Sequence, residues 1–87
     1  MNTIKDIITN ESIEDVLTAL TPNSSQPRID RLYTLYRFEA LETGELWSTY
    51  ERLFSQGILA RDEKGHIIKG PNWNEPTFIS EKKYSLE

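Results

Sequence analysis

Apolar residues recur at helical spacing through the first 56 residues, and this pattern constrains the fold more than any other feature of the chain. In the clearest case, the apolar residues after Ser12 stand at positions i, i+3, i+4 and i+7: Ile13, Val16, Leu17 and Leu20. Ser12 and Asp15 have the form of a capping box, and Pro22 stops the helix. The spacing predicts helices over about 3–9, 12–21, 27–42 and 44–56.

The predicted helix 27–42 has the widest apolar surface. Pro27 suits a first helical position, and apolar residues follow on more than one side: Ile29, Leu32, Tyr33, Leu35, Tyr36, Phe38, Ala40 and Leu41. We therefore expect this helix to lie centrally and to touch elements on two sides. Thr43 can cap the next helix, in which Trp47 is expected to be a core residue.

The pattern changes after Gly57. Residues 58–69 read as two short strands around a glycine-containing turn, which predicts a β-hairpin. Residues 70–87 are expected to be an irregular tail, in which 77–80 can add a third short strand. The predicted fold is mainly α with a small C-terminal β-hairpin (α+β): four helices, then two or three short antiparallel strands, in a single domain over 1–87.

Composition narrows the class of protein. With no cysteine, the chain has no disulfide, thiolate metal site or cysteine nucleophile, which agrees with a reducing compartment. No apolar run approaches the roughly 20 residues that span a bilayer, and the N-terminus has no signal-peptide core. We therefore expect a cytoplasmic protein that is not inserted in a membrane.

Acidic residues outnumber basic ones, 14 to 10, and the excess lies mainly in the N-terminal third. Residues 1–26 carry four carboxylates, Asp6, Glu11, Glu14 and Asp15, against the single basic residue Lys5. The negative electrostatic field of these carboxylates repels nucleic acid and favours a basic protein surface. The alternative is that a net charge of −4 serves only to keep the chain soluble.

No catalytic or metal-binding pattern stands out. His66 is the only histidine, and no second histidine or acidic cluster stands at ligand spacing, so a structural role is favoured over a catalytic one. The four glycines are isolated, so they form no phosphate-binding loop. We expect no enzyme activity, no metal and no cofactor.

The segment 53–65, Leu-Phe-Ser-Gln-Gly-Ile-Leu-Ala-Arg-Asp-Glu-Lys-Gly, resembles the end of the recognition helix and the start of the wing in winged-helix domains. In that family a glycine ends the helix, an aliphatic pair enters the sheet, and a charged turn projects as the wing. The resemblance implies a DNA-binding transcriptional regulator in which Ser48, Thr49 and Arg52 face the groove and Lys64 contacts the backbone. Glu51, beside Arg52, makes the same helix a poor surface for phosphates.

In character, a small, acidic, cysteine-free chain without catalytic motifs is also similar to bacterial immunity proteins and antitoxins. This resemblance implies a protein-binding inhibitor that covers a basic partner, such as a nuclease toxin. The expected contacts are Glu11, Glu14, Asp15, Asp30 and the loop around Trp73, whose aromatic ring either covers the core or anchors an interface. This is our first interpretation, and the DNA-binding regulator is the alternative. A continuous acidic face would favour the first and a basic stripe over helix and hairpin the second.

Overall fold

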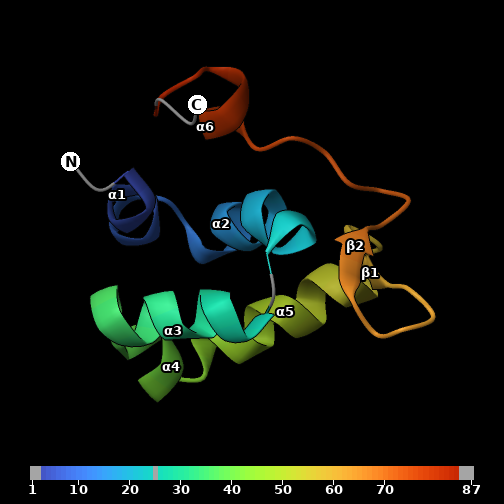
Figure 1. Ribbon diagram of the computed structural model, residues 1–87, viewed down its shortest axis with the longest axis horizontal. Coiled ribbons are helices and arrows are strands. Elements are labelled where there is room, and N and C mark those ends of the chain that lie inside the picture. The colour runs from blue at the N-terminus through green and yellow to red at the C-terminus, as the bar shows by residue number, and fades with distance from the viewer. Residues whose placement is uncertain (1–2, 25, 85–87) are drawn as a thin grey trace.

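The computed structural model describes residues 3–24 and 26–84 and is mostly helical, with a small two-stranded antiparallel sheet (Figure 1). The elements follow the chain in this order: α1 (Thr3–Asn10), α2 (Ile13–Leu20), the 3₁₀ turn η1 (Thr21–Asn23), α3 (Gln26–Tyr36), α4 (Glu39–Glu42), α5 (Glu45–Ser55), β1 (Leu59–Arg61), β2 (Ile67–Lys69) and α6 (Thr77–Ser80).

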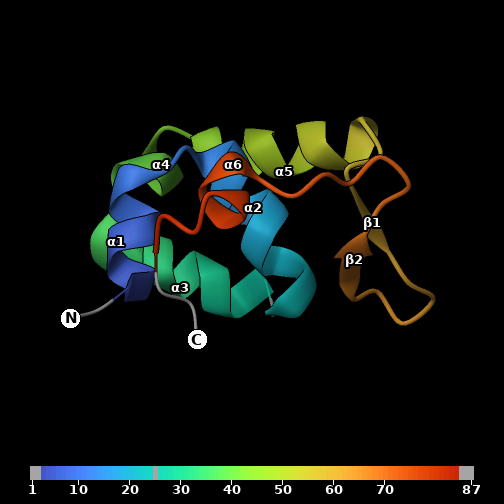
Figure 2. The same ribbon diagram turned by 90° about the horizontal axis from the view of Figure 1, so that it is seen from above.

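The central helix is α2. Figure 2 shows it between α3 and α5, and Figure 1 shows α6 on a further side. Five of its eight residues are buried: Ile13, Val16, Leu17, Thr18 and Ala19. Its start is as the sequence predicts, because the Ser12 hydroxyl accepts the Asp15 backbone N–H at 3.2 Å. The prediction that the helix over 27–42 occupies the centre is therefore wrong.

The predicted helix 27–42 is two helices, α3 and α4, with residues 37 and 38 between them. A tertiary contact lies at the break. The Arg37 guanidinium donates hydrogen bonds to the carbonyl oxygens of Ile8, at 3.4 Å, and Glu11, at 2.9 Å, where α1 ends. It thus satisfies carbonyl groups that the end of α1 leaves without a helical partner. The chain then turns, so that Ala40 is buried while Leu35 and Phe38 stay exposed.

The hairpin is present as predicted. Strands β1 and β2 pair antiparallel, with Leu59 opposite Lys69 and Arg61 opposite Ile67. Gly65 has a φ of +85°, which its turn position requires and which an L side chain rarely adopts. Leu59 and Ile67 are the buried strand residues, and they join the helical core.

The predicted irregular tail 70–87 and its third strand at 77–80 need correction, because residues 77–80 form the short helix α6. The segment leaves the hairpin and runs back across α2, as Figures 1 and 2 show, so it adds no strand to the sheet. Pro76 precedes the helix in an extended conformation, and Phe78 is buried against Tyr84, with ring centroids 5.8 Å apart. The last three residues of the predicted tail lie outside the described part of the chain.

The longest helices, α3 and α5, have 11 residues each. Over residues 3–24 and 26–84, no helix combines the length and the apolar character that crossing a bilayer requires.

Candidate protein-binding surfaces

Two of the acidic residues singled out in the sequence meet the Trp73 loop in space. Glu14 and Asp15 of α2 line a cleft of about 280 Å³, whose opposite wall is the segment from Asn72 to Thr77. Asn72, Asn74 and Glu75 add polar groups to the same cleft. We call these five residues, Glu14, Asp15, Asn72, Asn74 and Glu75, the acidic cleft.

The acidic cleft is joined to α5 by an ion pair. Arg52 donates a hydrogen bond to the Glu14 carboxylate at 2.7 Å, and both side chains are 48% exposed. An exposed pair of this kind contributes little to stability, at most about 1 kcal/mol. Its consequence is electrostatic, because it neutralises the one basic residue of α5.

The other two acidic candidates lie elsewhere. Glu11 accepts hydrogen bonds from the Lys83 ammonium and the Tyr84 hydroxyl, both at 2.7 Å, and its side chain is only 11% exposed. These bonds hold the pKa of Glu11 below its ordinary value. The residue therefore fastens the C-terminal segment to α1 and offers little surface to a partner.

Asp30 belongs to α3, where the Tyr50 hydroxyl donates a long hydrogen bond of 3.5 Å to its carboxylate. Partial burial raises the pKa of Asp30, which is the opposite of the effect at Glu11. The same burial and the facing carboxylate raise the pKa of Tyr50. Neither Glu11 nor Asp30 lines the acidic cleft.

Trp73 is attached to the core. It is partly buried, and its indole Nε1 donates a hydrogen bond of 2.7 Å to the carbonyl oxygen of Thr18. The Lys69 ammonium lies 4.2 Å from the centre of the ring. The ring lines a smaller cleft on the other side of its loop, with Leu20 and Ile79.

Two large aromatic residues are exposed, one within α5 and one immediately before α4. Trp47 is 61% exposed and Phe38 is 55% exposed, so the prediction of Trp47 as a core residue is wrong. The inner face of α5 is already filled by Leu46, Tyr50 and Leu53, which stand at i, i+4 and i+7. Trp47 is about 100° from Leu46 but only about 60° from Tyr50, so helical periodicity alone does not separate it from the buried stripe.

Exposed carboxylates lie on the same two helices, α4 and α5. Glu39 and Glu42 of α4 and Glu45 and Glu51 of α5 are all exposed, and the two helices pack against each other. Glu51 follows Trp47 by four residues, which places the two side by side on the helix. We call Phe38, Glu39, Glu42, Glu45, Trp47 and Glu51 the acidic corner.

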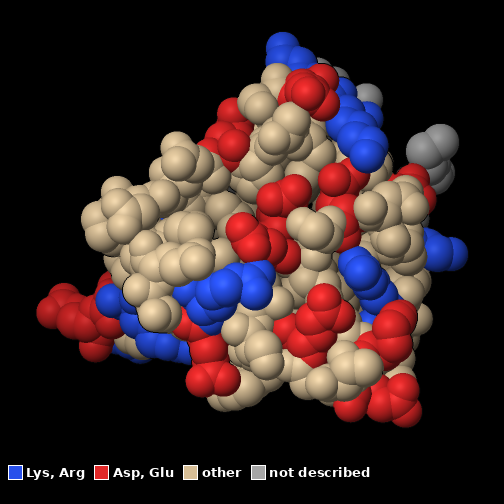
Figure 3. Space-filling view, turned by 180° about the vertical axis from the view of Figure 1, so that it is seen from behind, with Lys and Arg blue, Asp and Glu red and all other residues tan. Residues whose placement is uncertain are grey.

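Figure 3 views the side of the molecule on which α4 and α5 lie. Red carboxylates occupy its centre and its lower right, with blue cations between some of them. Because Arg52 links Glu14 to α5, the acidic cleft and the acidic corner are neighbouring parts of the surface around this helix.

The four residues considered for DNA contact are differently placed. Ser48 and Lys64 are exposed, but Thr49 is 4% exposed and its hydroxyl donates to the Glu45 carbonyl oxygen at 2.8 Å. Arg52 is the residue paired with Glu14. The exposed charged residues of α5 are therefore two glutamates and one arginine that already has an acidic partner.

His66 lies at the surface of the hairpin, where its Nδ1 is 3.5 Å from the Asp62 carboxylate. Within residues 3–24 and 26–84, no group of three histidine, cysteine, aspartate or glutamate side chains could hold a metal ion.

Comparisons with protein-family models, with curated proteins and with solved structures find no match to this chain. The arrangement of its own residues is therefore the basis for a functional proposal.

Proposed function

We propose that this chain is a non-catalytic protein-binding inhibitor of the immunity or antitoxin type, which covers a basic surface on a partner such as a nuclease toxin. The observation that carries the proposal is the 61% exposure of Trp47 on α5, with the exposed carboxylate of Glu51 one helical turn further along the same face. The acidic corner is the proposed centre of the interface, and the acidic cleft extends it.

The aromatic residues supply the affinity in this proposal. A tryptophan side chain covers about 150–250 Å² when it is fully buried, and tryptophan is enriched among the residues that dominate interface energies. Phe38 adds a second exposed ring from the start of α4. A partner that covers Phe38 and Trp47 would remove this exposed apolar surface from water, which favours association.

In this proposal the carboxylates select a partner with a basic surface. The four exposed glutamates of α4 and α5 attract a basic surface over a distance of roughly 10 Å and speed the encounter at low salt. Nuclease surfaces are basic because their substrate is a polyanion, so occlusion of such a surface would block substrate entry. Asp15 and Glu75 of the acidic cleft extend the same sign of charge beyond the Glu14–Arg52 ion pair.

The alternative proposal is a winged-helix DNA-binding regulator. In its favour, α5 is followed directly by a hairpin whose turn carries Lys64, which is the order of a recognition helix and a wing. Against it, the outer face of α5 presents Glu45 and Glu51, and Arg52 is paired with Glu14. A phosphate backbone would meet repulsion along that helix, so we place this proposal second.

The test uses affinity capture with the full chain as bait, in parallel with the double variant Phe38→Ser and Trp47→Ser. We expect the wild-type chain to retain a basic protein, to inhibit its nuclease activity, and to lose both properties in the double variant. Glu63→Lys, at an exposed position on the hairpin turn, is the matched charge control for Glu42→Lys in the acidic corner. Glu42→Lys should slow association at low salt, whereas Glu63→Lys should not.

Random duplex DNA, titrated at low and then physiological salt, separates the two proposals. Salt-sensitive DNA binding that Lys64→Gln weakens would overturn the inhibitor proposal and support the regulator. No binding at low salt would remove the regulator.

A further inference from the structure

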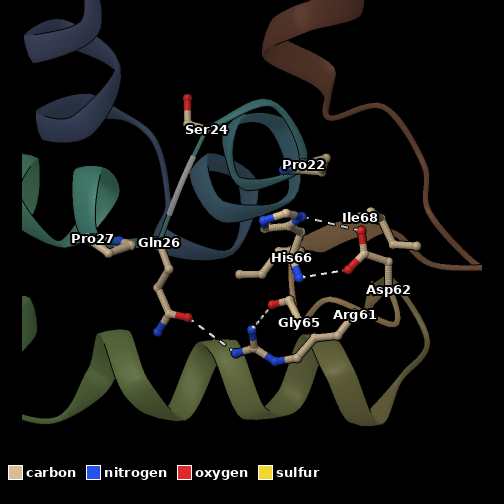
Figure 4. Close-up of a pocket in the computed structure, with 10 residues that line it drawn as sticks. Pro22, Ser24, Gln26, Pro27, Arg61, Asp62, Gly65, His66 and Ile68 are labelled. Atoms are coloured by element: carbon tan, nitrogen blue, oxygen red, sulfur yellow. Dashed lines mark hydrogen bonds and ion pairs between the residues drawn. The ribbon is translucent and has the colours of Figure 1, made fainter.

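Helices α3 and α5 run in opposite directions in the layer of the molecule that lies below α1 and α2 in Figure 1. Two contacts fix their alignment. Near the middle of both helices, the Tyr50 hydroxyl donates to the Asp30 carboxylate. Towards the hairpin, the Arg61 guanidinium donates to Gln26, the first residue of α3, and lies over the ring of Phe54 in the last turn of α5 (Figure 4). The start of α3 therefore lies level with the end of α5, and the end of α3 lies level with the start of α5.

Each of these helices carries one highly exposed large apolar side chain. Leu35, near the end of α3, is 64% exposed, and Trp47, near the start of α5, is 61% exposed. Because α3 packs against α1 and α5 packs against α2, the exposed side chains of both helices point away from this upper layer. Leu35 and Trp47 therefore lie at the same end of the lower layer, in contact with water.

An exposed charge stands one helical turn from each of these apolar residues, and the two charges are opposite in sign. Arg31 precedes Leu35 by four residues on α3, and Glu51 follows Trp47 by four residues on α5. Residues four apart are neighbours on the surface of a helix. Neither Arg31 nor Glu51 belongs to an ion pair within residues 3–24 and 26–84. Both charges are therefore available to another molecule.

The outer faces of α3 and α5 match each other when the two helices are antiparallel. If α3 of one molecule lies on α5 of another in this orientation, Leu35 covers Trp47. Arg31 then stands beside Glu51 in the same register, because the charge precedes the apolar residue on α3 and follows it on α5. A parallel orientation can match only one of these two pairs. The antiparallel arrangement therefore satisfies the apolar and the charged groups together.

We propose that these faces bind a second copy of the chain, with α3 of each molecule antiparallel on α5 of the other. A two-fold axis parallel to the helices makes both contacts at once, because it exchanges α3 and α5 between the two lower layers and keeps their level. The contact between Leu35 and Trp47 and the pair of Arg31 and Glu51 each occur twice in this closed dimer. This inference does not rest on the inhibitor proposal, although a partner that covers Trp47 would compete with the second copy.

The dimer is weak and dissociates on dilution. Helices α3 and α5 have 11 residues each, or about 16 Å of length, and each contributes one large apolar side chain to the contact. We expect the buried area to fall below the roughly 1,200–2,000 Å² that is usual for stable interfaces. The charged pairs then serve mainly to select the orientation of the two copies.

Sedimentation velocity of the full chain at low salt, from about 10 μM to about 1 mM, tests the association. We expect the sedimentation coefficient to rise with concentration from that of a monomer towards that of a dimer. Leu35→Ser and Trp47→Ser should each weaken the dimer at least about tenfold, because each removes an apolar contact that occurs twice. A chain that stays monomeric up to about 1 mM would overturn the proposal.

Arg31→Glu and Glu51→Arg test the pairing of the two charges. Each variant alone should dimerise about three- to tenfold more weakly than wild type, because like charges then face each other twice in its homodimer. An equimolar mixture of the two variants should dimerise more tightly than either variant alone, because both contacts in the mixed dimer join opposite charges. A mixture that associates no more tightly than its components would overturn the pairing and with it the proposed dimer.

The matched controls are Lys64→Glu and Glu63→Arg, which make the same changes of charge at exposed positions on the hairpin turn. Each control alone should associate as wild type does, and their mixture should show no gain. Association that falls equally in the controls would reflect net charge alone and would contradict the proposal. Thermal unfolding of every variant checks the fold. These samples contain no other protein, so a failure here leaves the inhibitor proposal standing.

Discussion

The burial of the two tryptophans is the opposite of what their positions in the sequence suggest. Trp73 stands in a proline-flanked loop, yet its ring is partly buried, hydrogen-bonded to the Thr18 carbonyl oxygen and covered by Lys69. Trp47 stands in a regular helix, yet it is 61% exposed and makes no hydrogen bond or cation contact with the described residues. An aromatic ring in a loop is thus structural here, and one in a helix stays at the surface.

The two rings differ in burial because the loop and the helix that carry them are held in place by different contacts. The segment 70–76 forms no regular element, so few backbone hydrogen bonds fix it and a large side chain must attach it to α2. Helix α5 satisfies its own backbone and fills its inner face with Leu46, Tyr50 and Leu53. A further large residue on α5 has no remaining space in the core. Substitutions at the contacts of each ring test this contrast.

Trp73→Ala should have the largest effect on stability. The change removes the packing of the ring on the core and leaves the Thr18 carbonyl oxygen without its donor, at a total cost of about 2–3 kcal/mol. Urea unfolding followed by circular dichroism measures the loss. A change below about 0.5 kcal/mol would mean that the loop is held by other contacts, and the contrast between the tryptophans would fail.

Trp73→Phe separates packing from hydrogen bonding at the same site. It keeps most of the aromatic surface and removes the indole N–H, so about 1 kcal/mol should be lost. Equal losses for Trp73→Phe and Trp73→Ala would assign the whole effect to the bond with Thr18.

Glu11→Gln should have the next largest effect, because Glu11 fastens the far end of the same C-terminal segment. It keeps the shape but loses the charge that binds Lys83 and Tyr84. The Lys83 side chain is 54% exposed, so solvent screening limits the cost to at most about 1 kcal/mol. Urea unfolding at neutral pH, with and without added salt, measures it.

The pH dependence of this contact has a definite sign. Because the folded-state pKa of Glu11 lies below its ordinary value of 4.5, its contribution is present above about pH 4.5 and is lost as the pH falls through the folded pKa. The difference between wild type and Glu11→Gln should therefore shrink in acid. A difference that is constant with pH would contradict a role for the charge.

Lys69→Gln should cost less, about 0.5 kcal/mol, because an exposed ammonium over an aromatic ring contributes only about 0.5–1 kcal/mol. The loss should vanish in a Trp73→Ala background, since the ring is then absent. A double-mutant cycle measured by urea unfolding gives this coupling directly.

Local patterns predicted most of the fold correctly. The helix after Ser12 and the hairpin after Gly57 are fixed by capping, periodicity and turn residues within a few positions of each other. The break after α3 was not predicted, and the contact made there by Arg37, to carbonyl oxygens 26 and 29 residues away, is one that no local pattern contains. Residues 77–80 are too few for periodicity to separate a strand from one helical turn.

The candidate surfaces were predicted only in part for the same reason. Glu14 and Asp15 were chosen for their charge, but their meeting with Asn72 and Glu75 depends on how the C-terminal segment crosses α2. Glu11 was chosen for the same reason, but its carboxylate is already bonded to Lys83 and Tyr84. Charge along a sequence indicates a sign of field, whereas the fold decides which charges remain available.

Trp47→Ser should have the smallest effect on stability, within about 0.3 kcal/mol, because a ring that is 61% exposed loses little packing when it is removed. Two measurements check this. Urea unfolding should give the same midpoint as wild type, and acrylamide should quench the fluorescence of Trp73→Phe, in which Trp47 alone emits, more strongly than that of Trp47→Phe. A loss above about 1 kcal/mol would show that Trp47 packs within the fold. The acidic corner would then lack its anchor, because a ring that stabilises its own chain is not free to enter a partner.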